Sequence, residues 1–160
     1  LLRLRAPELI VIIDDFAGTG HSLSGNLGDF YEKHAQSIAK SEIPVLVLVV
    51  CATEEGDERV RKRLGKLDEK ADLIVCEDLD PKHFAFRPEN KIWENQQKTL
   101  EAKELCQQLG SKVAKNHPLG YKDNGLLIVF HTNCPNNTLP ILHARGKGAN
   151  KWTPLFERSM

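Results

Sequence analysis

Short apolar runs alternate with segments of helical period through the first half of the chain. Residues 10–13, 45–50 and 73–76 are runs of apolar side chains. Uninterrupted runs of this length are typical of strands that are buried on both faces of a parallel sheet. The segments between them carry apolar residues three or four positions apart, which predicts helices. This order of elements predicts an α/β fold, a parallel sheet with right-handed crossovers and with helices flanking its faces.

The second half of the chain has a less regular pattern. Residues 92–109 have a helical period, and Gly110 stands where it would end that helix. Residues 126–130 predict a fourth strand, and the remaining residues predict an irregular C-terminal extension. Five apolar side chains of the predicted helix are expected in the core: Trp93, Leu100, Leu105, Cys106 and Leu109.

Length, charge and cysteine spacing narrow the class of protein. A chain of 160 residues predicts one domain spanning residues 1–160. Lys plus Arg and Asp plus Glu each number 22, and this balance gives no direct signal for nucleic acid or a membrane surface. The four cysteines are far apart and form no CxxC pair, so neither a structural zinc site nor a disulfide framework is indicated. The sequence shows no signal peptide or membrane-spanning apolar run, and we expect a cytoplasmic protein.

The segment LIVIIDDFAGTGHS, residues 9–22, carries the strongest chemical signal. Asp14 and Asp15 follow the first apolar run, at the strand end where open α/β sheets bind ligands. A glycine-containing turn comes next and opens a helix, whose free N–H groups attract anions. A phosphate cradle beside two carboxylates fits a sugar phosphate. The alternative is an ordinary strand-to-helix turn, with Asp as a cap and Gly for its geometry.

Two other phosphate-binding motifs do not fit this segment. A dinucleotide fingerprint would need a third glycine where Leu23 stands. A P-loop would need a Gly-Lys-Ser/Thr sequence at a fixed distance from the first glycine, and none follows.

The tract D-D-F-A-G-T-G-H-S resembles the ribose-phosphate loop of type I phosphoribosyltransferases. The resemblance implies that Asp14 and Asp15 hold the ribose hydroxyls and serve as the catalytic carboxylates. It also implies a type I phosphoribosyltransferase-like fold and a loop that binds the 5′-phosphate of phosphoribosyl pyrophosphate or a nucleotide. His21 departs from the family pattern, which often has a small residue there. The implied phosphate-binding residues are Ala17, Gly18, Thr19, Gly20 and Ser22.

A second polar segment, residues 131–138, follows the predicted fourth strand. Its residues Asn133, Asn136 and Asn137 offer both donors and acceptors, which suits recognition of a substrate's hydroxyls or of a base edge. An equally good interpretation is that these residues and the neighbouring prolines build turns. If the fourth strand is parallel to the first, both segments open on the same edge of the sheet.

The second half of the chain resembles phosphoribosyltransferase-like proteins of bacterial conflict systems, including retron-associated and other antiphage loci. The matching tracts are Gly120-Tyr121, N-x-P-N-N-T-L-P over residues 133–140, and W-x-P-L-F-x-R over residues 152–158. This resemblance covers nearly the whole chain, and it implies an effector of antiphage defence with protein partners in a defence complex. It does not decide whether the chain forms a homo-oligomer.

Three hypotheses follow, and they leave enzymatic activity open. The pyrophosphate loop and mobile loop of type I enzymes precede the acidic pair, but only residues 1–8 do so here, so we expect that an N-terminal part is missing. The chain is then a transferase or nucleotide-cleaving enzyme, a non-catalytic sensor of ribose phosphates, or an interaction protein. The first hypothesis implies Mg²⁺ as a cofactor. The sequence itself offers no convincing ligand set for a metal, because the acidic residues Glu77, Asp78 and Asp80 fit a solvated turn.

Overall fold

The computed structural model describes residues 8–41, 43–131, 133–146, 148 and 152–156. The chain divides into two compact units, Leu1–Leu79 and Asp80–Met160, and each is described by itself. The expectation of a single domain over residues 1–160 stays a prediction. No helix in the described part of the chain is long and apolar enough to cross a membrane.

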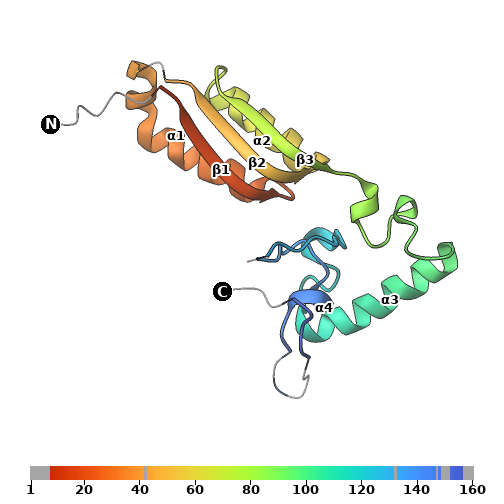
Figure 1. The fold of residues 1–160 in the computed structure, drawn as a ribbon. Helices are drawn as coiled ribbons and strands as arrows, with labels where there is room; N and C mark the ends of the chain where they lie inside the picture. Colours follow the sequence, from red (N-terminus) through yellow and green to blue (C-terminus); the bar gives the residue numbers. More distant parts are fainter. Residues whose placement is uncertain (1–7, 42, 132, 147, 149–151, 157–160) are drawn as a thin grey trace. The chain divides into compact units, whose positions relative to one another are not determined.

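The first unit is a three-stranded parallel sheet with two helices, as the apolar pattern predicted (Figure 1). The strand order is β1-β2-β3, and Ile12 lies beside Val47, which lies beside Leu73. The elements in chain order are β1 (Ile10–Ala17), α1 (His21–Ser41), β2 (Val45–Thr53), α2 (Glu54–Leu67) and β3 (Asp72–Leu79).

Both helices lie on the same face of this sheet (Figure 1). Right-handed crossovers explain this, because the strand order never reverses and each helix therefore returns over the same side. α1 and α2 contact each other and bury the core beneath them. The buried side chains of this core include Leu23, Leu27, Tyr31, Val45, Val47, Val49, Val60, Leu64 and Leu73.

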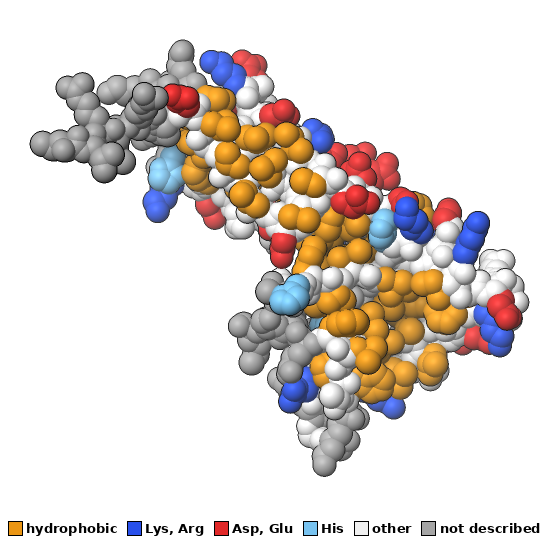
Figure 2. Space-filling model, in the orientation of Figure 1, with side chains coloured by type: hydrophobic (Ala, Val, Ile, Leu, Met, Phe, Trp, Pro, Cys, Tyr) orange, Lys and Arg blue, Asp and Glu red, His pale blue; other side chains and the backbone are white. Residues whose placement is uncertain are grey.

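The opposite face of the sheet is apolar and exposed, so the prediction of strands buried on both faces is wrong. Val11 is 43% exposed, Ile13 72%, Val50 47% and Ile74 45%. Figure 2 shows apolar side chains gathered over the strands of this unit. A continuous apolar run shows only that both faces of a strand are apolar. Whether each face is covered depends on where the crossovers place the helices.

The start of α2 carries residues that are typical of a helix N-terminus. Thr53 caps the helix, since its hydroxyl oxygen accepts a hydrogen bond from the Gly56 N–H at 3.2 Å. Glu54, Glu55 and Asp57 occupy the first turn, where negative charge is favourable.

The second unit has one long helix, α3 (Gln96–Val113), and a short one, α4 (Pro140–His143). α3 begins later than predicted because the Asn95 side chain caps it, accepting from the Lys98 N–H at 2.9 Å. It also continues past Gly110, which lies so close to the Pro118 carbonyl that a Cβ would collide with it. This glycine therefore serves close packing and does not end the helix. Three 3₁₀ turns complete the regular structure of the described residues here: η1 (Pro81–His83), η2 (Pro88–Asn90) and η3 (Tyr121–Asp123).

Two further predictions for this unit are wrong. Residues 126–130 form no strand, and Leu126 makes only isolated bridges to Phe84 and Thr138. Leu100 and Leu105 are 50% and 55% exposed, so neither belongs to the core. The buried residues described in this unit include a small cluster of Ala85, Leu119 and Leu139, with Cys106 at its margin, and the side chains of Leu126 and Cys134.

Candidate functional site

The acidic pair lies inside β1, because the strand continues to Ala17. Strand alternation therefore turns the two side chains to opposite faces of the sheet. Asp15 is exposed on the uncovered face, in phase with Val11 and Ile13, whereas Asp14 is half-buried on the helix side. The two carboxylates are adjacent in sequence but present different faces to a ligand.

Asp14 has a perturbed environment. Burial raises the pKa of its carboxyl above the ordinary value, and the nearby charge of Asp15 raises it further. The backbone N–H of Asp15 opposes these effects by donating to Asp14 Oδ1 at 2.9 Å. The net rise in pKa means that folding disfavours the charged form of Asp14.

The loop after β1 is packed against the start of α2. Ala17 and Thr19 are only 2% and 6% exposed. The Thr53 hydroxyl donates to the Gly18 carbonyl at 2.5 Å. Gly56 allows this close approach, since a Cβ there would collide with the carbonyls of Ala17 and Gly18. The loop is therefore held in place by the capping residue of α2 and by the glycine that follows it.

Gly20 connects this loop to α1 with a φ of +67°, a backbone conformation that favours glycine. The Ser24 N–H donates to the Gly20 carbonyl at 2.9 Å and so closes the first turn of α1. The backbone N–H groups of residues 21–23 come before the first such bond, so they have no carbonyl partner within the helix. The first turn of this 21-residue helix also contains no acidic residue. Its positive end is therefore suited to an anion.

The structure joins the predicted phosphate-binding residues into one turn at the start of α1. Ser22 is exposed there, while the other four are buried: Ala17, Gly18, Thr19 and Gly20. The predicted substrate-recognition residues belong to the second unit, where Asn136 is exposed and Asn137 is 3% exposed. Asn133 forms a local turn, its Oδ1 accepting from the Cys134 N–H at 2.8 Å. Whether these asparagines face the loop stays a prediction.

Sequence reasoning assigned no functional neighbourhood to Cys51, which is buried and lies beside Phe16 on β1 and Glu77 on β3. Its thiol donates to the Asp15 carbonyl at 3.8 Å. Burial, followed by the charges of Asp15 and Glu77, raises the pKa of Cys51 to about 11, so the thiol stays neutral. Only the register of the strands reveals this neighbourhood.

The acidic residues of β3 also differ from expectation. Glu77 and Asp78 belong to the strand, which ends at Leu79, and not to a turn. In the part of the chain that the structure describes, no group of three or more His, Cys, Asp or Glu residues is placed to hold a metal ion. The carboxyl ends of β1 and β3 therefore carry acidic residues, and the turn before α1, which is suited to an anion, follows the end of β1.

Comparison with known proteins gives one result. No curated protein and no solved structure matches the chain. A protein-family model described as PRTase-CE matches residues 3–158, nearly the whole length of the sequence. Together with the parallel α/β sheet and the turn that opens α1, this match shows that the chain belongs to the PRTase-CE family and is a phosphoribosyltransferase-like protein.

Proposed function

We propose that the chain binds phosphoribosyl pyrophosphate or a nucleotide through the loop at the start of α1. The observation that carries the proposal is the turn at Gly20, with its positive φ, directly before a 21-residue helix whose first turn has no acidic residue. The 5′-phosphate would bind the N–H groups of this turn, with the Ser22 hydroxyl as a further donor.

The packing of the loop supports this role energetically. Thr53 and Gly56 already hold the loop through the bond to Gly18 and the close approach of α2. A ligand would then bind without ordering the backbone of the loop, which removes part of the usual entropy cost of binding. Thr53 is therefore proposed as a positioning residue, since it acts on the ligand only through the loop.

The ribose would lie on the side of the acidic pair. The exposed carboxylate of Asp15 is free of helix packing, and its hydrogen bonds to sugar hydroxyls would be of the stronger, charge-assisted kind. Asp14 faces the other side of β1, so we assign it a smaller contribution to ribose binding. In a ribosyl transfer, negative charge here would stabilise the positive charge that develops on the sugar.

Mg²⁺ is part of this proposal as a companion of the ligand. It binds oxygen and is commonly held by one or two carboxylates together with substrate phosphates. The exposed carboxylate of Asp15 fits that pattern as a single protein ligand, and the remaining ligands would come from the diphosphate, the ribose and water.

A second candidate function is a non-catalytic module within a complex of an antiphage defence system. The exposed apolar face of the first unit favours it, because large apolar surfaces often mark protein interaction sites. The resemblance to proteins of bacterial conflict systems supports the defence role for either candidate. Release of pyrophosphate from phosphoribosyl pyrophosphate in the presence of Mg²⁺ would distinguish the enzyme from the module.

Binding of phosphoribosyl pyrophosphate, measured by calorimetry with and without Mg²⁺, tests the proposal. We expect Asp15→Asn to weaken binding about tenfold to a hundredfold, the effect of one lost charged hydrogen bond. Asp14→Asn should have the smaller effect. Asp29→Asn is the matched control, because Asp29 is an exposed carboxylate two turns into α1. Equal affinities of wild type, Asp14→Asn and Asp15→Asn would remove the ribose assignment.

A further inference from the structure

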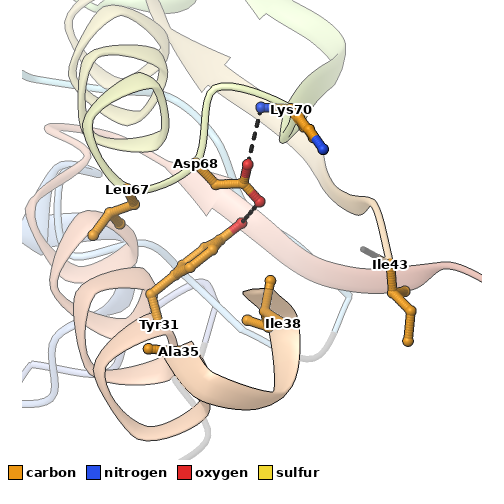
Figure 3. A pocket seen from close by; sticks show the side chains of 7 residues that line it. All are labelled: Tyr31, Ala35, Ile38, Ile43, Leu67, Asp68 and Lys70. Carbon is orange, nitrogen blue, oxygen red and sulfur yellow. Dashed lines mark hydrogen bonds between the residues drawn. The ribbon is translucent and has the colours of Figure 1, made fainter. Parts of the chain in front are cut away.

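A separate pocket lies at the opposite end of the first unit, near the amino ends of β2 and β3. Its volume is about 350 Å³, at the small end of the range for ligand sites. Figure 3 shows its lining, which comes from the second half of α1, from the turn before β2, from the end of α2 and from the turn after α2. The lining residues are Tyr31, Ala35, Ile38, Ile43, Leu67, Asp68 and Lys70.

The polar groups of the pocket are arranged around Asp68. The Tyr31 hydroxyl donates to Asp68 Oδ2 at 3.2 Å, and the Lys70 backbone N–H donates to Asp68 Oδ1 at 2.9 Å (Figure 3). Burial and then the charge of Asp68 raise the pKa of Tyr31, so its hydroxyl keeps its proton. Both donors are thus already used on the carboxylate.

This end of the pocket can still accept hydrogen bonds from a ligand, through the oxygen atoms of Asp68 and Tyr31. An ionised carboxylate has about four acceptor positions, of which two are filled here, and the Tyr31 oxygen also has lone pairs. The other walls are aliphatic and come from Ala35, Ile38 and Leu67. A ligand that fits must therefore bring hydrogen-bond donors at one end and a short apolar body at the other.

We propose that this pocket binds a primary ammonium group carried on a short, branched aliphatic chain. The ammonium donates to Asp68 and to the Tyr31 oxygen, and the chain packs against the aliphatic walls. Two sources share this chemistry, a simple alkyl amine and an aliphatic amino acid. An amino acid would also place its carboxylate near Lys70, at the side of the pocket that carries a positive charge. The site lies away from the loop at α1 and does not depend on the proposed function.

Titration of the isotope-labelled 160-residue chain by NMR tests the proposal, with 3-methylbutylamine, L-leucine and 3-methylbutan-1-ol as probes. We expect the amine or leucine to shift the amides of Tyr31, Ile38 and Lys70, and to bind at least about tenfold more tightly than the alcohol. If the source is an amino acid, Lys70→Met weakens leucine alone. Equal binding of all three probes, or shifts confined to other residues, would overturn the proposal.

Three variants locate the interaction. Asp68→Asn should abolish the preference for the ammonium probe over the alcohol, whereas Asp29→Asn, outside the pocket, should keep it. Ala35→Leu places a larger side chain in the pocket and leaves the Asp68 carboxylate in place. Leucine is a good helix former, so α1 should keep its structure, and the variant should block binding of every probe. The site is wrong if Asp68→Asn and Asp29→Asn behave alike, or if Ala35→Leu binds the amine as wild type does.

Discussion

The two units of the chain are stabilised by different kinds of hydrogen bond. In the first unit the strands pair in a regular parallel ladder, with Ile12 beside Val47 and Val47 beside Leu73. The described residues of the second unit form no such ladder, and its loops are connected by single backbone bonds and by side chains that donate to carbonyls: Trp93 Nε1 to Ala85 at 2.7 Å and Thr138 Oγ1 to Ile128 at 2.6 Å. The backbone bonds of a ladder repeat from residue to residue whatever the side chains are, whereas each of these side-chain bonds depends on one particular residue.

This difference indicates where a single substitution should lower the free energy of unfolding most. In the irregular unit, the chain passes itself closely at Gly110 and Gly120, and in the regular unit it does so at Gly56; a Cβ at any of these glycines would collide with a backbone carbonyl. On the strands of the regular unit, the loss of stability should follow the burial of the side chain that is replaced. Substitutions on the covered and exposed faces of the sheet should therefore differ strongly in their effect.

The largest effect is expected at Gly120. Its φ is +90°, and a Cβ there would collide with the Asn137 carbonyl. Gly120→Ala should lower the free energy of unfolding by about 3–4 kcal/mol, from backbone strain plus the collision. Gly148→Ala is the control, because Gly148 also has a positive φ but no heavy atom within 4 Å of its Cβ position; strain alone predicts about 1–2 kcal/mol.

Urea unfolding followed by tryptophan fluorescence measures this pair of variants. Both tryptophans, Trp93 and Trp152, belong to the second unit, so the signal reports on that unit. Equal losses for the two variants would mean that the close contact at Gly120 contributes nothing.

The next largest effect is expected on the covered face of the sheet. Val47 is 0% exposed and Ile13 is 72% exposed. Val47→Ala should cost about 2–3 kcal/mol through lost apolar burial and the cavity that remains. Ile13→Ala should cost less than about 0.5 kcal/mol. Amide hydrogen exchange in β2 measures both, and comparable losses would show that the second face of the sheet is covered after all.

A smaller effect is expected at Asp14 and should depend on pH. Because folding raises the pKa of this carboxyl, the folded state binds a proton more readily than the unfolded state. Ionised Asp14 therefore reduces stability, fully so above the folded-state pKa and not at all well below 3.8, the ordinary pKa of an aspartate. Asp14→Asn should raise the free energy of unfolding at pH 7, and this gain should vanish in acid. A gain that persists at low pH, or a loss at pH 7, would contradict the assigned cause.

The sequence predicted the order of strands and helices in the first unit, although not which face of the sheet is covered, and it predicted less of the second unit. Periodicity located all three strands, because apolar side chains recur regularly along each of them. It failed at residues 126–130, where an apolar run bonds to isolated partners and not to a strand. It also misplaced the end of α3, because Gly110 is required by a contact with Pro118 that is distant from the helix pattern.

The candidate site was predicted in part for the same reason. The loop and its glycines are contiguous, so the sequence identified the turn that opens α1. The separation of Asp14 and Asp15 to opposite faces follows only from the continuation of β1 to Ala17. The proximity of Cys51 to Asp15 and Glu77 depends on strand register, which no local pattern encodes.

The most direct test of phosphate binding at the start of α1 is the affinity of Ser22→Glu for phosphoribosyl pyrophosphate. A negative charge in this first turn should stabilise the helix, by about 0.3–1 kcal/mol, while it repels the phosphate. Ser22→Gln controls for side-chain size, and Asn26→Glu places the same charge one turn further along α1. We predict that Ser22→Glu binds at least about tenfold more weakly than both controls although it unfolds at a higher urea concentration than wild type. Wild-type affinity in the folded Ser22→Glu variant would contradict the account.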